Sequence, residues 1–378
     1  MKFSPPNRPM LKLGALRHTP TSQRWMSVRP MILQSGVLPT RKSMHPVTES
    51  SYKFDTHTEH PRKKMTIQHL YQMRRSGLPI TMLTAYDYPT ARALDTHGVD
   101  IALVGDSLAQ VCLGLPSTTR LTLDEMLHHT RAVARGAVYP FLVADMPFGS
   151  YHASPEDAVR SAVRMVQDGH VEAVKLEGGP EIASTVRRIT QVGVPVMAHV
   201  GLMPQRHTAL SGYRVQGREA TGARAVLEGA LALQDAGAFS IVLEAIPYRL
   251  AEYITARLSI PTIGIGAGPS TSGQVLVWDD AMTRWHGKKA KFVRRFADVG
   301  HEEGRGVENY VGAVRDGSFP NAEVEGYEMD SGEWEKFLEQ VGDSGWRSSA
   351  DGVQGRQEDS SSVISPEEKA SSRVAQAV

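Results

Sequence analysis

Cysteine, net charge and long apolar runs are all scarce in this sequence. A single cysteine, Cys112, occurs among 378 residues, which excludes an intramolecular disulfide and fits a reducing compartment. The formal net charge is only +1, so the charge balance does not indicate nucleic acid or an anionic membrane surface as a partner. No apolar run approaches the roughly 18 residues that a transmembrane helix needs. The remaining composition, 41% hydrophobic and 22% charged, is typical of a globular protein with a sizeable core.

Acidic residues are absent from the N-terminal region, where the first one is Glu49. Lysine and arginine are scattered there among Ser, Thr, Pro, Met and Leu, which is the composition of a mitochondrial or chloroplast transit peptide. The many prolines disfavour one continuous helix, and an ordinary disordered extension is the alternative interpretation. We expect residues 1–60 to be a transit peptide and disordered leader, with "RWMS" at Arg24–Ser27 as a candidate cleavage site. This predicts a mitochondrial protein, or a cytoplasmic one if the extension is not a signal.

The C-terminal region has few apolar residues. Residues 342–378 are rich in serine, glycine and charge, so they cannot bury enough apolar surface to fold and are expected to form a disordered tail. The folded unit is therefore expected to span residues 61–341, as a catalytic barrel followed by C-terminal helices.

Eight short apolar runs recur through the central region. Their apolar content is nearly continuous, as in strands buried on both faces of a parallel sheet. Helix-like stretches separate them; one starts with Ser154 as N-cap and Pro155 at the first helical position, and ends at Gly169. This alternation predicts an α/β fold of the (β/α)8 TIM-barrel type. The runs are 81–85, 101–105, 141–145, 173–177, 196–200, 240–244, 262–266 and 275–279.

The link between the last two runs is short for a crossover helix. Eight residues separate Gly266 from Val275, and a single helical turn could bridge them. A doubly wound open sheet is the structural alternative. The sequence "GIGAG" that begins this link, Gly264–Gly268, is interpreted as a tight turn that lets substrate approach the backbone.

Polar residues follow or end most of these runs. Since the active site of such a barrel lies at the carboxyl ends of its strands, these side chains are expected to face one mouth. Burying so much charge is costly unless the charges are paired or bind a metal ion. The candidate site residues are Asp106, Ser107, Asp145, Lys175, Glu177, His199 and Glu244. The histidine pair His128-His129 falls on an expected helix and is interpreted as surface or packing.

The carboxylates within this set suggest metal-assisted chemistry. Asp106, Asp145 and Glu177 are hard oxygen ligands that suit Mg2+ better than zinc. Lys175 lies two residues before Glu177 on one strand, so both side chains point the same way and the lysine could neutralise an anion on the metal. A 2-oxo acid would chelate Mg2+, which acidifies the carbon next to its carbonyl. Glu244 would then be free to remove the proton.

Nine motifs, in order along the chain, resemble those of the ketopantoate hydroxymethyltransferase (3-methyl-2-oxobutanoate hydroxymethyltransferase) family. The resemblance covers about Met65 to Gly300. The motifs are "TAYDYPTARALD", "LVGDSLAQVCLG", "STTRLTLDEMLHHTRAVARGA", "VADMPFGSY", "AVKLEGG", "AHVGLMPQ", "SGYRVQGR", "VLEAIP" and "IGIGAG".

This resemblance implies a (β/α)8 barrel and a role for each matching residue. Asp106, Asp145 and Glu177 match the residues that gather round Mg2+. Ser107 and Lys175, together with the two aspartates, match positions that contact the oxo-acid substrate, and Glu244 matches the proton acceptor. His199 is not fixed by the resemblance; its position at a strand end indicates either a substrate-binding role or a satisfied barrel histidine.

The implied reaction transfers a hydroxymethyl group from 5,10-methylenetetrahydrofolate to 3-methyl-2-oxobutanoate, giving 2-dehydropantoate for pantothenate and coenzyme A synthesis. The implied partners are the 2-oxo acid, the folate and other copies of the chain, since family members form homo-oligomers, often decamers. Neither nucleic acid nor a membrane is expected.

Two segments depart from the family pattern. Leu115-Pro116 stands where a His-Asp or Tyr-Asp pair is usual, and residues 282–288 replace a glycine- and leucine-rich stretch. Residues 290–300 are expected to resume a helix. The alternative functions are a Mg2+-dependent C–C lyase or mutase acting on another 2-oxo acid, and a non-catalytic barrel scaffold. The contexts of Lys175 and Glu244 favour the transferase.

Overall fold

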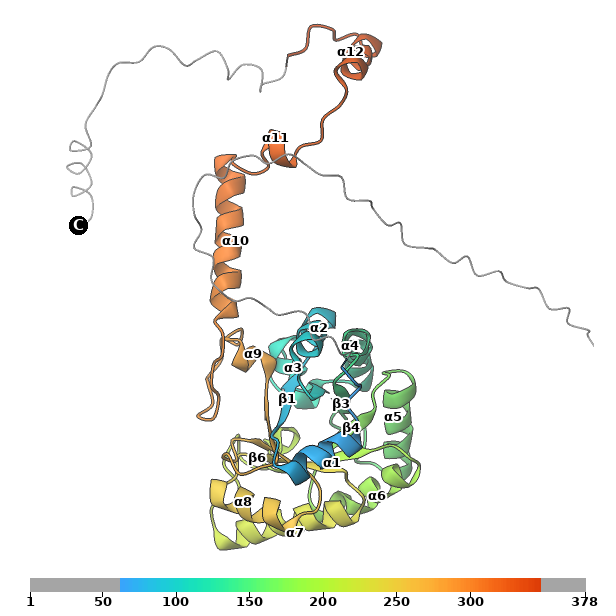
Figure 1. Cartoon of the computed structure of the whole chain (residues 1–378), viewed down its shortest axis with the longest axis vertical. Helices are drawn as coiled ribbons and strands as arrows, with labels where there is room; N and C mark the ends of the chain where they lie inside the picture. The colour runs from blue at the N-terminus through green and yellow to red at the C-terminus, as the bar shows by residue number, and fades with distance from the viewer. Residues whose placement is uncertain (1–61, 348–378) are drawn as a thin grey trace, which may run out of the picture. The chain divides into compact units, whose positions relative to one another are not determined.

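Eight parallel strands close into a barrel in the computed structural model, which describes residues 62–347 (Figure 1). Each strand pairs with its neighbours in chain order, and β1 pairs with β8 to close the ring. The predicted (β/α)8 barrel is confirmed, and the open sheet is excluded. The strands are β1 Ile80–Thr84, β2 Ile101–Val104, β3 Phe141–Asp145, β4 Ala173–Glu177, β5 Val196–Gly201, β6 Ser240–Glu244, β7 Thr262–Ile265 and β8 Gly273–Leu276.

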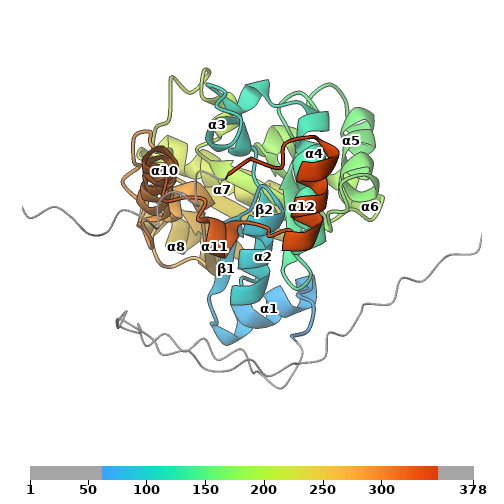
Figure 2. The same ribbon diagram turned by 90° about the horizontal axis from the view of Figure 1, so that it is seen from above.

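Helices surround these strands, as the view from above shows (Figure 2). Their starts follow local capping chemistry: the Ser154 hydroxyl accepts from the Asp157 amide, and Thr122 and Glu125 form a reciprocal capping box. The α-helices of the barrel are α1 Ile67–Ser76, α2 Tyr88–His97, α3 Leu108–Val111, α4 Leu123–Gly136, α5 Pro155–Gln167, α6 Ala183–Gln191, α7 Ala220–Asp235, α8 Tyr248–Arg257 and α9 Trp278–Ala281. Single 3-10 turns lie at η1 Thr118–Arg120, η2 Pro180–Ile182 and η3 Pro204–Arg206.

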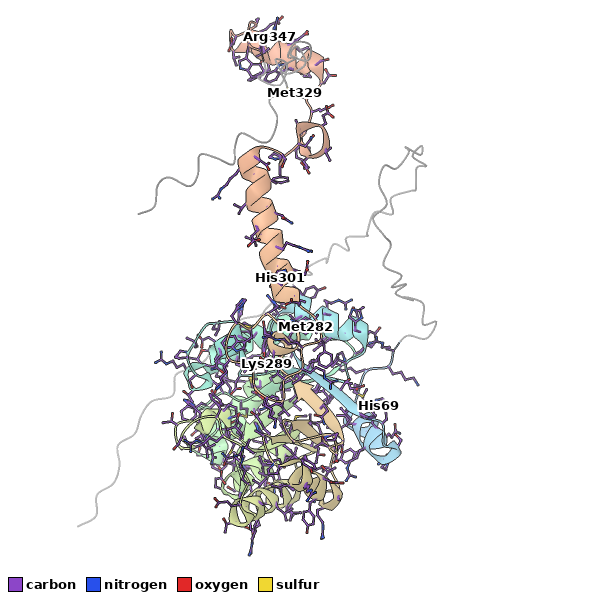
Figure 3. The ribbon with its side chains drawn as sticks, turned by 90° about the vertical axis from the view of Figure 1, so that its left-hand side faces the viewer. His69, Met282, Lys289, His301, Met329 and Arg347 are labelled. Atoms are coloured by element: carbon purple, nitrogen blue, oxygen red, sulfur yellow. The ribbon has the colours of Figure 1, made fainter. Side chains whose placement is uncertain are left out.

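Three further helices follow the barrel: α10 Val299–Asp316, α11 Ala322–Glu325 and α12 Ser331–Gln340. Figure 3 labels His301 near the start of α10, and Met282 and Lys289 in the segment before it. No residue of α10 is buried. Among the helices described, none is long and apolar enough to cross a membrane.

Side chains alternate between the inside and the outside of the barrel. On β3, Phe141 and Val143 belong to an interior apolar cluster, whereas Leu142 and Ala144 belong to the cluster beneath the helices. Because both faces are buried, the strands read as continuous apolar runs. Leu70 of α1 is fully buried in the interior cluster, so this helix packs against the amino-terminal end of the barrel.

The link between β7 and β8 contains no helix, so the expected helical turn there was wrong. Residues 266–272 form an irregular loop. Seven extended residues reach roughly 23 Å, whereas the loop must return past a four-residue strand of roughly 13 Å, so no helix is needed to span the distance. The eighth strand also begins earlier than predicted, at Gly273, and the last two residues of the predicted run, Trp278 and Asp279, belong to α9 instead.

The helix expected over residues 290–300 was also wrong. The chain is irregular there until α10 begins at Val299. Val293 is buried and Phe292 contacts the turn after β7, so tertiary contacts decide the conformation of this segment. The predicted transit peptide, and the predicted tail beyond residue 347, lie outside the described residues.

Candidate active site

Strand register brings the charged side chains of neighbouring strands together at the carboxyl end of the barrel. Asp145 pairs in register with Lys175, and Glu177 with His199. Asp145 is two residues beyond Val143, so it points to the same interior as the apolar cluster. The site is therefore the continuation of the barrel core into a charged layer.

All seven predicted site residues line one cavity of about 190 Å³. The cavity thus joins residues that are far apart in the sequence but lie at the ends of β2 to β6. Most of these side chains are buried, and the carboxylate of Glu244 is the more open one, with 15% of its side chain exposed. The seven are Asp106, Ser107, Asp145, Lys175, Glu177, His199 and Glu244.

Lys175 is the central cation of this cavity. Its Nζ lies 2.9 Å from Asp145 Oδ1, and the other oxygen of Asp145 accepts from the Asp106 amide at 3.0 Å. Burial by itself would lower the pKa of Lys175, but the combined attraction of Asp145, Glu177 and Asp106 outweighs it and raises the pKa. The lysine is therefore charged at neutral pH and available to an anionic ligand.

Carboxyl groups nevertheless outnumber the single lysine among the residues that line the cavity. Burial first, and then the neighbouring Asp145, raises the pKa of Asp106 to about 7. Burial and the charge of Asp106 raise the pKa of Glu177 well above its usual range. Several carboxylates here face a single lysine, so a bound cation would relieve their repulsion.

His199 lies between the lysine and two glutamates. Its Nδ1 is 3.3 Å from Lys175 Nζ, and its Nε2 is 3.2 Å from Glu244 Oε2, although that second contact lacks the angle of a hydrogen bond. Burial, followed by the nearby lysine, lowers the pKa of His199, so the ring is neutral at neutral pH. The tautomer with its proton on Nε2 suits both neighbours, because Nδ1 can then accept from Lys175. His199 is thus a cavity residue that lies beside both Lys175 and Glu244.

Ser107 is held by a chain of hydroxyl groups that the sequence did not reveal. The Trp278 amide donates to Thr84 Oγ1 at 2.8 Å, and Thr84 Oγ1 donates to the Tyr86 hydroxyl at 2.8 Å. The Tyr86 hydroxyl lies 2.8 Å from Ser107 Oγ. Since Tyr86 accepts from Thr84, its own proton can go to Ser107, which leaves the serine proton free for a ligand in the cavity. Gln205 is a second missed residue; it contacts Asp106 and Glu177.

The predicted Mg2+ site can be tested against the donor atoms that the cavity offers. Within residues 62–347, no group of three or more His, Cys, Asp or Glu side chains is arranged so that it could hold a metal ion as it stands. The donor chemistry nevertheless fits, because Asp106, Asp145 and Glu177 offer only hard oxygen atoms, and a bound cation would relieve the repulsion that helps to raise the pKa of Asp106 and of Glu177. The Mg2+ site therefore stays a prediction.

The glycines of the turn after β7 lie close to aromatic side chains. A side chain at Gly266 would lie within 2.7 Å of the Phe292 ring, and one at Gly268 would collide with Tyr248. Gly266 and Gly268 also adopt φ values of +63° and +81°, which favour glycine. The turn thus makes room for aromatic side chains, and Ile265 and Phe292 line the cavity. The approach of substrate to this turn stays a prediction.

The remaining sequence features lie away from the cavity. Neither Leu115-Pro116 nor any residue of 282–288 lines it. His128 is exposed, and His129 is partly buried with Nδ1 2.7 Å from the Tyr86 carbonyl oxygen, as a surface or packing role requires.

A closed parallel barrel with ionisable side chains buried at its carboxyl ends defines an enzyme of the (β/α)8 class. Residues 64–322 match the profile of a family described as ketopantoate hydroxymethyltransferase. The chain belongs to this family and is a hydroxymethyltransferase.

Individual relatives support the same family assignment. A 3-methyl-2-oxobutanoate hydroxymethyltransferase from Emericella nidulans is 45% identical over 324 residues, covering 82% of this chain and 93% of the relative. One of the same name from Deinococcus radiodurans is 52% identical over 251 residues, covering 66% of this chain and 88% of the relative. Among solved structures, a phosphonopyruvate hydrolase crystallised with oxalate and Mg2+ aligns with a TM-score of 0.47 and 15% identity, over 77% of this chain and 99% of that one. No functional conclusion follows from that likeness.

Proposed function

We propose that the chain transfers a hydroxymethyl group from 5,10-methylenetetrahydrofolate to 3-methyl-2-oxobutanoate, giving 2-dehydropantoate. Membership of the family supports this assignment. The observation that carries it is one cavity in which Lys175, three buried carboxylates and the more open Glu244 meet. This arrangement suits a small anionic substrate that must lose a proton from carbon.

We propose that Asp106, Asp145 and Glu177 hold Mg2+. Bound there, the ion would supply Lewis acidity that favours an enolate of the oxo acid. The excess of carboxylates over Lys175 supports this assignment, because a divalent cation would balance their charge.

The side chains of the cavity bind the substrate and remove its proton. Lys175, with its charged Nζ, binds the substrate anion, and Ser107 donates its free proton to a substrate oxygen. Glu244 removes the proton from C3, and the His199 ring lies beside its carboxylate, with Nε2 3.2 Å from Glu244 Oε2. The resulting enolate carbon forms a bond to the methylene carbon of the folate. Both bonds from that carbon to folate nitrogens break, the nitrogens take up protons, and a water molecule supplies the hydroxyl of the transferred hydroxymethyl group.

The direct test is turnover of 3-methyl-2-oxobutanoate with 5,10-methylenetetrahydrofolate and Mg2+, with and without EDTA. We expect 2-dehydropantoate to form with Mg2+, EDTA to abolish its formation, and added Mg2+ to restore it. Turnover of another 2-oxo acid without folate, and none of this substrate, would instead indicate a lyase or mutase.

We further propose that the chain forms a homo-oligomer, up to the decamer that the family resemblance implies. Helix α10 supports association, because it has no buried residue and exposes Val307, Tyr310 and Val314 on neighbouring turns. Light scattering coupled to size exclusion would give the number of subunits, and a monomer would contradict the proposal.

We propose that residues 1–60 direct import into mitochondria, since they are basic and free of acidic residues before Glu49. A fluorescent protein fused to these residues should enter mitochondria. A cytoplasmic signal would contradict the proposal.

A further inference from the structure

Gln205 is a buried amide at the carboxyl end of the barrel that no catalytic step above uses. It lies in η3, just after β5, and only 4% of it is exposed. We infer that Gln205 is a positioning residue, which sets the carboxylates of Asp106 and Glu177 for a divalent cation. This inference rests on the proposed Mg2+-dependent function.

Gln205 contacts both carboxylates through different groups. Its side-chain Nε2 donates to Asp106 Oδ2 at 2.9 Å, and its backbone amide donates to Glu177 Oε2 at 3.1 Å. Asp106 follows β2 and Glu177 ends β4, so one residue from a third part of the barrel joins the two. Because each carboxylate gives one oxygen to Gln205, its other oxygen is turned to a fixed direction.

The orientation of the Gln205 amide is itself fixed. Its second N–H donates to the Met146 carbonyl oxygen at 3.0 Å, and its Oε1 accepts from the Tyr151 hydroxyl at 2.6 Å. A flipped amide would place Oε1 against the Asp106 carboxylate and the Met146 carbonyl, where both contacts would be repulsive. Every hydrogen-bonding group of the Gln205 side chain is therefore satisfied in one arrangement only.

Tyr151 holds this arrangement through its hydroxyl group. Its side chain is buried, and its hydroxyl lies 3.3 Å from the Glu177 carbonyl oxygen and 3.4 Å from the Glu177 amide nitrogen as well as near Gln205. The hydroxyl thus connects the backbone of one proposed ligand with the side chain that aims another. Groups that orient metal ligands in this way typically change metal affinity by about 10- to 100-fold when removed.

The experiment measures Mn2+ binding to the full chain by the relaxation rate of water protons. In Gln205→Met the side chain keeps its size but loses its hydrogen bonds, and we expect the dissociation constant for Mn2+ to rise about 10- to 100-fold. Raising the Mg2+ concentration should then restore much of the turnover rate. The matched control is Gln216→Met, because the Gln216 side chain bonds the Arg214 carbonyl oxygen and touches neither carboxylate; its Mn2+ affinity should stay within twofold of wild type, as is usual for surface changes away from such contacts.

Tyr151→Phe provides a milder second variant that preserves packing. Loss of one hydrogen bond to Gln205 should weaken Mn2+ binding about 2- to 10-fold. The double variant should bind less weakly than the sum of the two single effects predicts, because the Tyr151 hydroxyl acts largely through the Gln205 amide.

The possible outcomes distinguish failure of this inference from failure of the proposed function on which it rests. Wild-type affinity in Gln205→Met and Tyr151→Phe, with tight binding by the wild type, overturns the role of Gln205 and leaves the proposed function intact. No Mn2+ binding by the wild type overturns the metal-dependent function and this inference together. Weaker Mn2+ binding in both variants, with unchanged binding in the Gln216→Met control, supports the positioning role of Gln205.

Discussion

The two halves of the barrel interior are built on the same strands but have opposite chemistry. Towards the amino end, Phe141 and Val143 of β3 and Met197 of β5 pack in an apolar cluster. Two residues further along each strand stand Asp145 and His199, equally buried but ionisable. The apolar half can be stabilised by burial alone, whereas the charged half requires partners for every group.

This contrast shows that different residues of the same strands build the fold and the site. The apolar layers fix the register of the strands, and the register fixes which charges meet, such as Asp145 with Lys175. Changes in the apolar half should therefore alter stability and leave the chemistry intact, whereas changes in the charged half should alter the chemistry.

The largest expected effect is on stability, from Phe141→Ala. The Phe141 ring is buried and packs edge-on against Phe239, with centroids 5.5 Å apart. Removing it should lower the free energy of unfolding by about 3–5 kcal/mol. Urea denaturation measures this change, while the turnover number of the folded fraction should match wild type. A large fall in that turnover number would erase the proposed distinction between the two halves.

Next in size is Lys175→Met, which removes the central cation but keeps the length of the side chain. Without the lysine, nothing offsets the buried carboxylates or binds the substrate anion, so kcat/KM should fall about 10²- to 10³-fold. Steady-state kinetics at saturating Mg2+ check this prediction. Activity within twofold of wild type would remove Lys175 from the substrate site.

A smaller effect is expected from Asp106→Ala on the metal requirement. Loss of one of three proposed oxygen ligands should raise the half-saturating Mg2+ concentration by at least about tenfold. Activity measured across a Mg2+ series gives this value. The effect is specific if the KM for folate is unaltered, and an unchanged Mg2+ curve would contradict the ligand role.

The smallest change tested lies outside the barrel interior, in Ser154→Ala. The Ser154 hydroxyl caps α5 by accepting from the Asp157 amide at 3.1 Å. Its loss should cost about 1 kcal/mol of unfolding free energy and leave catalysis unaltered. Thermal denaturation should report this modest loss, and Ser154→Thr, which can still cap, should recover most of it.

Much of this organisation could be predicted because strands, and the polar residues that follow them, form recognisable local patterns in a sequence. The continuous apolar runs identified the eight strands, and the charges after them, from Asp106 to Glu244, were all found at one cavity. Because the active site of a (β/α)8 barrel lies at the carboxyl ends of its strands, residues far apart in the chain could be predicted to share one cavity.

Features set by long-range contacts could not be predicted in this way. The run "VLVWD" is as apolar as the others, yet its end turns into α9, where the Trp278 amide bonds the Thr84 hydroxyl. Gln205 gives no local signal, because its role depends on Asp106, which lies 99 residues away in the chain. Phe292 likewise fills the space at Gly266 only once the fold is formed.

The central claim is that the charged end of the barrel removes a proton from the oxo acid by means of Glu244. Exchange of the C3 proton of 3-methyl-2-oxobutanoate in D2O with Mg2+, followed by NMR, tests it most directly. The account predicts rapid exchange with the wild type, and exchange slowed about 10²- to 10⁴-fold in Glu244→Gln, which keeps its fold and its Mn2+ affinity. Undiminished exchange in Glu244→Gln would contradict it.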